Sequence, residues 1–256
     1  MNKLVVDKLP DPGIGVIFIS DDSSDEFEKA YLKVRAQEKR LLDDMQVAQL
    51  PVTDVDNLHY REWKMRQHST NLVLEHIKQS PLTGLDWFLD IGCGNGWFSG
   101  LLAKETAANV LAIDINKVEL EQAQRVFQQP NLYFAYLDLL ANPPKNKQFS
   151  MIFLNSCFQY FENPKALLDL CLSLLIQGGE IHIIDSPFYA PDEVLAAKVR
   201  SDDYYQGLGV GEVGQFYHHQ SLALLEGYNV RWMYQPAPKA IRSPNDSPFA
   251  WVKISQ

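Results

Sequence analysis

The sequence predicts an α/β fold in which a mostly parallel sheet carries helices on both faces. Two observations indicate this class. After about residue 86, short apolar segments alternate with amphipathic helices, and one apolar segment ends in a glycine cluster that begins a helix. Strands joined through helices of roughly 10–15 residues pair in parallel by right-handed crossovers. Such sheets are buried on both faces, as the apolar strand segments require.

Each expected element has a local signal in the second part of the chain. Asn116 and Glu119 form a helix N-terminus, and Asn163-Pro164 is an N-cap followed by a first-turn proline. We expect Gly178-Gly179 to end the helix that starts there. The expected parallel strands are 86–91, 110–113, 132–137, 151–154 and 180–185, with a helix at 97–106 and an antiparallel edge pair at 229–234 and 249–254.

The first 80 residues follow a different pattern, with short extended pieces and two predicted helices. Ser23 and Glu26 form a capping-box pair, and Pro51 closes the first helix. The apolar positions of the first helix are Phe27, Tyr31, Val34, Leu41 and Met45. The second helix is predicted over residues 60–78, and one face of it includes Tyr60, Trp63, Thr70, Leu74 and Ile77. We therefore divide the chain into an N-terminal helical cap or lid, residues 1–80, and an α/β domain, residues 81–256.

Composition and charge exclude several classes of protein. The net charge is −9, with 32 acidic against 23 basic residues, which disfavours binding to nucleic acid. Cys93, Cys157 and Cys171 form no C-x-x-C pair, which argues against disulfides and structural zinc. No apolar stretch has the length of a signal peptide or a membrane span. We expect a soluble cytoplasmic protein with no membrane or nucleic-acid partner.

The most informative segment is the glycine loop after the first strand of the sheet. Gly92, Gly94 and Gly96 follow Phe88-Leu89-Asp90-Ile91 and precede the helix at Trp97. Glycines at a strand–helix turn let the backbone approach a ligand closely, and the helix start presents free N–H groups. In a dinucleotide-binding loop the third glycine would come one residue later.

Acidic residues at the ends of successive strands narrow the choice of ligand. Asp90, two residues before the first glycine, suits a cationic amino group better than a phosphate. Asp114 ends the second strand about twenty residues on, where a carboxylate can accept both ribose hydroxyls. Asp138 ends the third strand, where it can accept the adenine amine. The three acids together favour an adenosyl ligand that carries an amine.

From Asp86 to Gly179 the sequence resembles the class I methyltransferases that use S-adenosylmethionine (SAM). The resemblance implies a Rossmann-like, seven-stranded sheet whose last strand is antiparallel, and SAM as cofactor. It places Asp90, Gly92, Gly94 and Gly96 along the methionine part of SAM, with Cys93 in the same loop, Asp114 on the ribose, Ile115 beside the adenine, Asp138 and Leu139 at the adenine edge, and Asn155 at the amino-acid end.

Residues 59–66 also resemble a bacterial subgroup of methyltransferases with no assigned substrate. This implies that the helix bearing Tyr60, Trp63 and Arg66 lies over the cofactor as a lid. Packing of the two aromatic residues is an equally open interpretation. Arg66 pairs either with the SAM carboxylate or with a surface acid, and we favour the surface acid.

The acceptor side is less defined by sequence. We expect Tyr60, Trp63, Tyr160, Tyr189 and His218 near the acceptor. His218 and His219 are adjacent and point in different directions, so no metal site is expected, although one of them can serve as a general base. His182 alternates along a strand and fits a core position. Tyr204-Tyr205 and Phe216-Tyr217 belong to an aromatic insertion that either packs or forms a substrate wall.

The function that these features predict is methyl transfer from SAM to a small-molecule acceptor, with S-adenosylhomocysteine as product. No catalytic residue is assigned, because the cofactor itself supplies the electrophile and some acceptors need no base. Two alternatives stay open: a non-catalytic protein that binds SAM or a partner, and an NAD-dependent oxidoreductase. The acceptor and the oligomeric state do not follow from the sequence.

Overall fold

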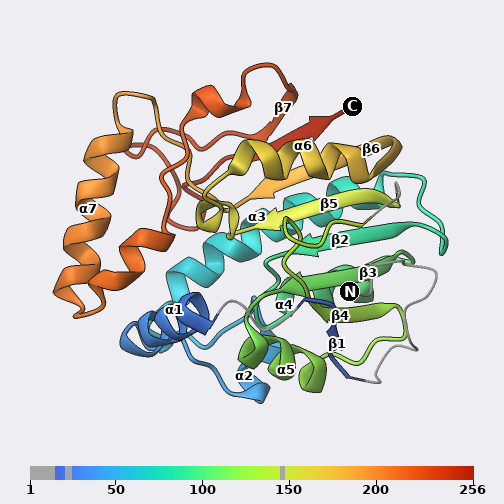
Figure 1. The fold of residues 1–256 in the computed structure, drawn as a ribbon, viewed down its shortest axis with the longest axis horizontal. Helices are drawn as coiled ribbons and strands as arrows, with labels where there is room; N and C mark the ends of the chain where they lie inside the picture. Colours follow the sequence, from blue (N-terminus) through green and yellow to red (C-terminus); the bar gives the residue numbers. More distant parts are fainter. Residues whose placement is uncertain (1–14, 21–24, 145–147) are drawn as a thin grey trace.

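A single sheet of eight strands organises the computed structural model, which describes residues 15–20, 25–144 and 148–256 (Figure 1). The strand order is β1-β4-β3-β2-β5-β6-β8-β7. The first six strands in that order are parallel, whereas β8 runs antiparallel to both β6 and β7. The strands are β1 (Ile17–Phe18), β2 (Trp87–Ile91), β3 (Asn109–Asp114), β4 (Leu132–Tyr136), β5 (Phe149–Asn155), β6 (Leu175–Ile184), β7 (Asn229–Tyr234) and β8 (Trp251–Ser255).

Helices cover both faces of this sheet. The α-helices are α1 (Asp25–Gln37), α2 (Asp44–Gln49), α3 (Tyr60–Lys78), α4 (Trp97–Glu105), α5 (Lys117–Val126), α6 (Pro164–Leu174) and α7 (Val194–Gly207). Short 3-10 helices are η2 (Phe158–Tyr160), η3 (Gly211–Phe216) and η4 (Leu222–Leu225). Within the described residues, no helix combines the length and the apolar character that crossing a bilayer demands.

The alternation of strands and helices confirms the predicted fold class. The five expected parallel strands and the antiparallel pair at the C-terminal end are all present, and the last strand is antiparallel. The predicted caps also form: the side chain of Asn116 accepts the Glu119 N–H, and that of Asn163 accepts the Ala166 N–H. The predicted strand number of seven was wrong, because the two-residue β1 adds to the sheet beside β4.

Two predicted element boundaries were also wrong. The first helix does not continue to Pro51 but ends at Gln37, and a separate α2 follows; Lys39 adopts a positive φ of 55° between them. Ser23 of the expected capping box lies outside the described residues. Gly178-Gly179 do not end a helix: α6 stops at Leu174, and both glycines lie within β6.

Alternate strand residues bury into two cores, one on each face of the sheet. One core contains Leu89, Leu111 and Ile152 and packs against α6. The opposite core contains Phe88 and Val110 and packs against α3, α4 and α5. Because both faces are covered, the carboxyl ends of the parallel strands remain the place where a ligand can enter.

Beyond those carboxyl ends, α1 and the segment α7–η3 lie together, as Figure 1 shows. Ala30 and Val34 of α1 form a small separate core with Tyr205, Val210 and Val213. The N-terminal helix and an insertion far along the chain therefore form one layer over the end of the sheet.

Candidate active site

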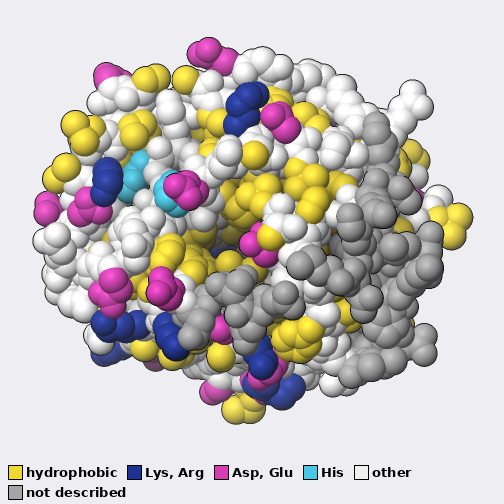
Figure 2. All heavy atoms as spheres, viewed as in Figure 1, with side chains coloured by type: hydrophobic (Ala, Val, Ile, Leu, Met, Phe, Trp, Pro, Cys, Tyr) yellow, Lys and Arg dark blue, Asp and Glu magenta, His cyan; other side chains and the backbone are white. Residues whose placement is uncertain are grey.

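Two adjoining cavities lie at the carboxyl ends of the strands, beneath α1. The larger has a volume of about 550 Å³ and the smaller about 80 Å³. Both are lined by Tyr31, Gly92, Gly94, Glu119 and Ser156, so they form one continuous cleft around the glycine loop. Figure 2 shows a recess near the centre of this face, with hydrophobic side chains inside it.

The glycine loop needs its glycines for two different reasons. Gly92 and Gly94 have positive φ angles of 69° and 54° and line the cleft. A Cβ on Gly94 would lie 2.9 Å from the Glu119 carboxylate. Gly96 has φ 75° but lines neither cavity, because a Cβ there would meet the Ala123 Cβ at 2.7 Å. Gly96 therefore allows α4 to pack in the core, whereas Gly92 and Gly94 border the cleft, where a Cβ on Gly92 would meet the Cys157 Cβ at 2.6 Å.

Asp114 is tied directly to the glycine loop. One carboxylate oxygen accepts the Gly94 N–H at 2.7 Å, and the other accepts the N–H groups of Ile115 and Asn116 at 2.7 and 2.8 Å. Burial raises the pKa of Asp114, while these three hydrogen bonds oppose the shift. The acid at the tip of β3 thus fixes the loop and borders the larger cavity.

Asp138 lies on the same cavity, at the tip of β4. Its carboxylate accepts the N–H groups of Leu140 and Ala141, each at 3.1 Å, and so shapes the turn that follows. Ile115 and the buried Leu139 add apolar surface to the same wall. Two acids and two apolar side chains therefore surround one end of the larger cavity.

The smaller cavity combines buried acids with arginines. Asp90 is 1% exposed and accepts the Ser99 hydroxyl at 2.5 Å; burial raises the pKa of Asp90 to about 7. Asn155 presents a buried Oδ1 with no hydrogen-bond partner among the described residues. An unpaired acceptor next to a carboxyl group fits an ammonium group of a ligand. Arg35, Arg40 and Arg66 line the other side.

Most of these arginines are already paired with acids. Arg66 and Arg40 lie 3.0 and 2.6 Å from Glu62, and together they lower the pKa of Glu62 to about 2 although burial opposes the shift. Arg66 therefore pairs with an acid of its own helix, which is the interpretation favoured from the sequence. Arg35 lies 3.8 Å from Glu119 of α5, and burial raises the pKa of Glu119 to about 7 against the effect of Arg35.

The outer wall of the larger cavity is aromatic. Phe27 packs against Tyr31, Tyr160 and Phe216 with ring centroids 5.4–5.8 Å apart, and Tyr31 contacts Tyr160 edge to face. The rings come from α1, η2 and η3. Phe216 of the predicted aromatic insertion lines the cavity, whereas Tyr205 is buried in the small core under α7.

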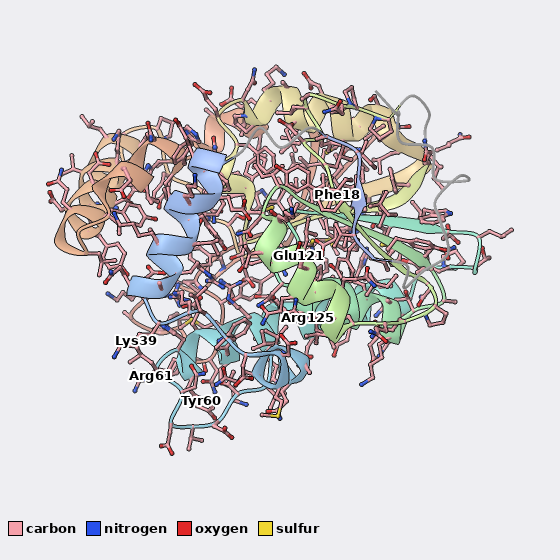
Figure 3. All side chains as sticks on the ribbon, turned by 60° about the horizontal axis from the view of Figure 1, so that its bottom comes forward. Phe18, Lys39, Tyr60, Arg61, Glu121 and Arg125 are labelled. Carbon is pink, nitrogen blue, oxygen red and sulfur yellow. The ribbon has the colours of Figure 1, made fainter. Side chains whose placement is uncertain are left out.

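The residues expected near the acceptor are only partly brought together. Tyr160 and His218 line the larger cavity, and Trp63 lines the smaller one while packing edge to face on Trp97. Tyr60 lies at the outer end of α3 (Figure 3) and lines neither cavity. Tyr189 also lines neither cavity and packs on His219. Those two positions do not belong to the cleft.

A second cluster of polar side chains lies away from the cleft. His76, Glu180 and His182 bring their ligand atoms within 4.8 Å of one another. The Trp251 indole N–H donates to Nδ1 of His182, so the His182 proton is on Nε2, which faces Glu180 at 3.3 Å. A metal ion bound to Nε2 would force the proton onto Nδ1, where it would meet the indole N–H of Trp251. The cluster is better described as a hydrogen-bonded network around a carboxylate.

Several cleft residues were not identified from the sequence. Tyr31 and Arg35 reach the cleft from α1, and Glu119 was interpreted only as part of a helix cap. Ser156, at the tip of β5, has a positive φ of 61° and lines both cavities. A strained residue at the edge of a parallel sheet often marks a functional site, but its φ cannot be inferred from a serine in the sequence.

The fold and the cleft define a class I methyltransferase domain, the class that uses SAM. Residues 88–179 match the family model described as a methyltransferase domain. The matched residues include the glycine loop, the acids Asp90, Asp114 and Asp138, and the strands β3, β4 and β5.

Curated relatives and solved structures agree with this class. The chain is 26% identical to the malonyl-[acyl-carrier protein] O-methyltransferase of Acetivibrio thermocellus, over 56% of this chain and 52% of that protein. It is 34% identical to the ubiquinone biosynthesis O-methyltransferase of Xylella fastidiosa, over 45% of this chain and 48% of that protein. The chain thus spans about half the length of these curated relatives.

The fold resembles that of geranyl diphosphate C-methyltransferase from Streptomyces coelicolor, solved with Mg²⁺, geranyl diphosphate and S-adenosyl-L-homocysteine. The TM-score is 0.55 at 12% identity, with 90% of this chain and 97% of that chain covered. At this identity the likeness concerns the fold alone.

Proposed function

We propose that this protein transfers the methyl group of SAM to a small acceptor that shares the larger cavity with the adenosyl part of the cofactor. The observation that carries the proposal is the hydrogen bond between the Asp114 carboxylate and the Gly94 N–H, which sets the ribose acid against the glycine loop. A cavity of about 550 Å³ is within the range of roughly 300–1,000 Å³ of small-molecule sites. SAM supplies the methyl group on a sulfonium.

The side chains present fit this cofactor along the whole cleft. We assign the ribose to Asp114, the adenine faces to Ile115 and Leu139, and the adenine amine to Asp138. Asp90, the unpaired Oδ1 of Asn155 and the loop Gly92–Gly94, including Cys93, are assigned to the methionine end. Gly96 is not assigned to the cofactor, because a Cβ at this position would point into the core against Ala123.

The protein's own contribution is binding, orientation and exclusion of water. The aromatic side chains of α1, η2 and η3 border the acceptor side of the cavity without filling it, which supports a small molecule as the acceptor. Holding two reactants in line can contribute roughly 7–11 kcal/mol to lowering a barrier. The two relatives named above are O-methyltransferases, which supports an oxygen acceptor.

The non-catalytic alternative would have the aromatic insertion close the acceptor side. Phe216 and His218 border an open cavity instead of filling it, which supports methyl transfer over mere cofactor retention. No dinucleotide spacing of the glycines supports the oxidoreductase alternative.

Calorimetric titration with SAM and S-adenosylhomocysteine tests the proposal. We expect binding in the micromolar range and a loss of at least tenfold in Asp114→Ala. Asp86→Ala is the matched control. The Asp86 carboxylate also stabilises a turn, but this turn follows Gly84 and precedes β2, at the opposite edge of the sheet from the cleft. No binding by the unaltered protein at millimolar ligand would refute the proposal.

A further inference from the structure

His218 occupies a distinct position in the larger cavity. Its backbone N–H donates to the Gln159 carbonyl at 2.7 Å, which anchors the residue beside η2, directly after the tip of β5. The half-buried ring lines the cavity, and among the described residues no hydrogen bond to this imidazole is found. The neighbouring His219 is different: its ring contacts the Ser201 hydroxyl at 2.8 Å and packs on Tyr217.

Apart from Glu162, the other ionisable groups that line the cavity are already engaged, including Cys157, whose thiol donates to the Ile91 carbonyl. Asp114 and Asp138 accept backbone N–H groups, and Glu119 faces Arg35. Burial raises the pKa values of Tyr31 and Tyr160, which keeps both phenols protonated. Glu162, from the segment after η2, lies at the exposed rim. His218 is therefore the group placed to take a proton from something bound inside.

We propose that His218 is the general base of the methyl transfer and that the acceptor is a compact aromatic hydroxyl compound. This inference rests on the proposed function. The flat rings of Phe27, Tyr31, Tyr160 and Phe216 favour a planar acceptor, since aromatic pairs gain stability edge to face and offset. A hydroxyl acceptor needs a base, and His218 is on the wall that such a ring would face.

The acceptor oxygen forms a bond to the methyl carbon while its proton moves to the free ring nitrogen of His218. The C–S bond breaks, and its electrons stay on the sulfur of S-adenosylhomocysteine. The protonated imidazole then loses its proton to solvent at the cavity mouth. Burial lowers the pKa of His218, while Glu162 opposes the shift, so the ring is neutral and able to act as a base near pH 7.

The test uses phenol as the probe, because its hydroxyl stays protonated near pH 7, with anisole as its analogue without an exchangeable proton. With S-adenosylhomocysteine bound, we expect both compounds to bind, and phenol alone to shift the NMR signals of the His218 ring through a hydrogen bond to its free nitrogen. With SAM, we expect His218→Asn to lower the rate of phenol methylation by roughly 10²–10³-fold at pH 7 and to remove the pH dependence that the imidazole sets.

His219→Gln is the control, since it removes a neighbouring ring that does not line the cavity; it should keep both the methylation rate and the pH profile. Every variant must bind S-adenosylhomocysteine as the unaltered protein does. If the unaltered protein binds S-adenosylhomocysteine but neither binds nor methylates phenol, the acceptor class is wrong. If His218→Asn keeps the methylation rate and the pH profile, the base assignment is wrong. Failure to bind S-adenosylhomocysteine at all would instead refute the proposed function.

Discussion

Arg35 of α1 lies 3.8 Å from Glu119 of α5, and this ion pair joins the two sides of the cleft. Both side chains are largely buried, with 18% and 9% of their surface exposed. The pair connects the helix that covers the cavity to the helix that follows Asp114. It gives α1 a specific closed position over the glycine loop.

Replacing Arg35 by Met is expected to loosen α1. The change leaves the Glu119 carboxyl without its counter-ion. We expect a loss of stability of about 1–2 kcal/mol, a value between those of exposed and of buried ion pairs. We expect faster hydrogen exchange along α1 and about tenfold weaker binding of S-adenosylhomocysteine, measured by mass spectrometry and calorimetry.

Lys33→Met provides the comparison, because Lys33 is on the same helix and pairs with Glu212 in an exposed contact. Exposed pairs contribute little, so this variant should keep the exchange rates and the affinity. Equal effects of the two substitutions would mean that the Arg35–Glu119 pair does not hold α1 in place.

The buried Asp90 makes stability depend on pH in a predictable direction. Burial raises the pKa of Asp90 to about 7 in the folded protein, from 3.8. The folded state therefore binds the proton more tightly than the unfolded state, so stability is full below about pH 4 and falls as the pH rises toward 7. Asp90→Asn removes this loss, because the amide carries no charge at any pH.

We compare the free energies of unfolding of Asp90→Asn and of the unaltered protein. The size of the pKa shift predicts that their difference changes in favour of the variant by on the order of 2–4 kcal/mol from pH 5 to pH 8. Thermal unfolding of both proteins at the two pH values measures the gain. Asp86→Asn, in an exposed turn, should show no such gain. An Asp90→Asn effect that is the same at pH 5 and pH 8 would contradict a titrating carboxyl at this position.

Gly96 should be needed for folding and not for the ligand. Gly96→Ala combines a positive φ with a contact of 2.7 Å to the Ala123 Cβ. A left-handed backbone costs about 1–2 kcal/mol and overpacking a further 1–3 kcal/mol. We expect a loss of about 3 kcal/mol in denaturant unfolding, with near-normal affinity for S-adenosylhomocysteine in the fraction that folds.

Gly178→Ala separates the two contributions. Gly178 has nearly the same φ, 77°, but nothing lies within 4 Å of its would-be Cβ. Only the backbone cost should remain, about 1 kcal/mol. Similar losses for the two variants would show that the close packing of Gly96 contributes nothing.

The local part of the site could be predicted from the sequence. Asp90, Gly92, Gly94 and Asp114 lie at strand ends, and parallel strands bring their carboxyl ends to one edge of the sheet. The apolar periodicity fixed most strands to within two residues. These features depend on short-range patterns, which a sequence displays directly.

The missing parts depend on contacts between distant segments. Leu41 and Met45 suggested one long first helix, yet both are exposed, and Arg40 turns instead to Glu62 of α3. Gly178 and Gly179 gave a helix-end signal that the pairing of β6 with β5 overrides. The aromatic wall brings Phe27 against Phe216, 189 residues further along the chain, and no local sequence pattern predicts such a contact.

The most direct test of the central claim is an experimental structure of the complex with S-adenosylhomocysteine. The account predicts that the ribose hydroxyls bond to Asp114, that the adenine lies between Ile115 and Leu139, and that the sulfur faces the wall formed by Tyr160 and His218. A ligand bound elsewhere, or an Asp114 carboxylate that makes no contact with the ribose, would contradict it.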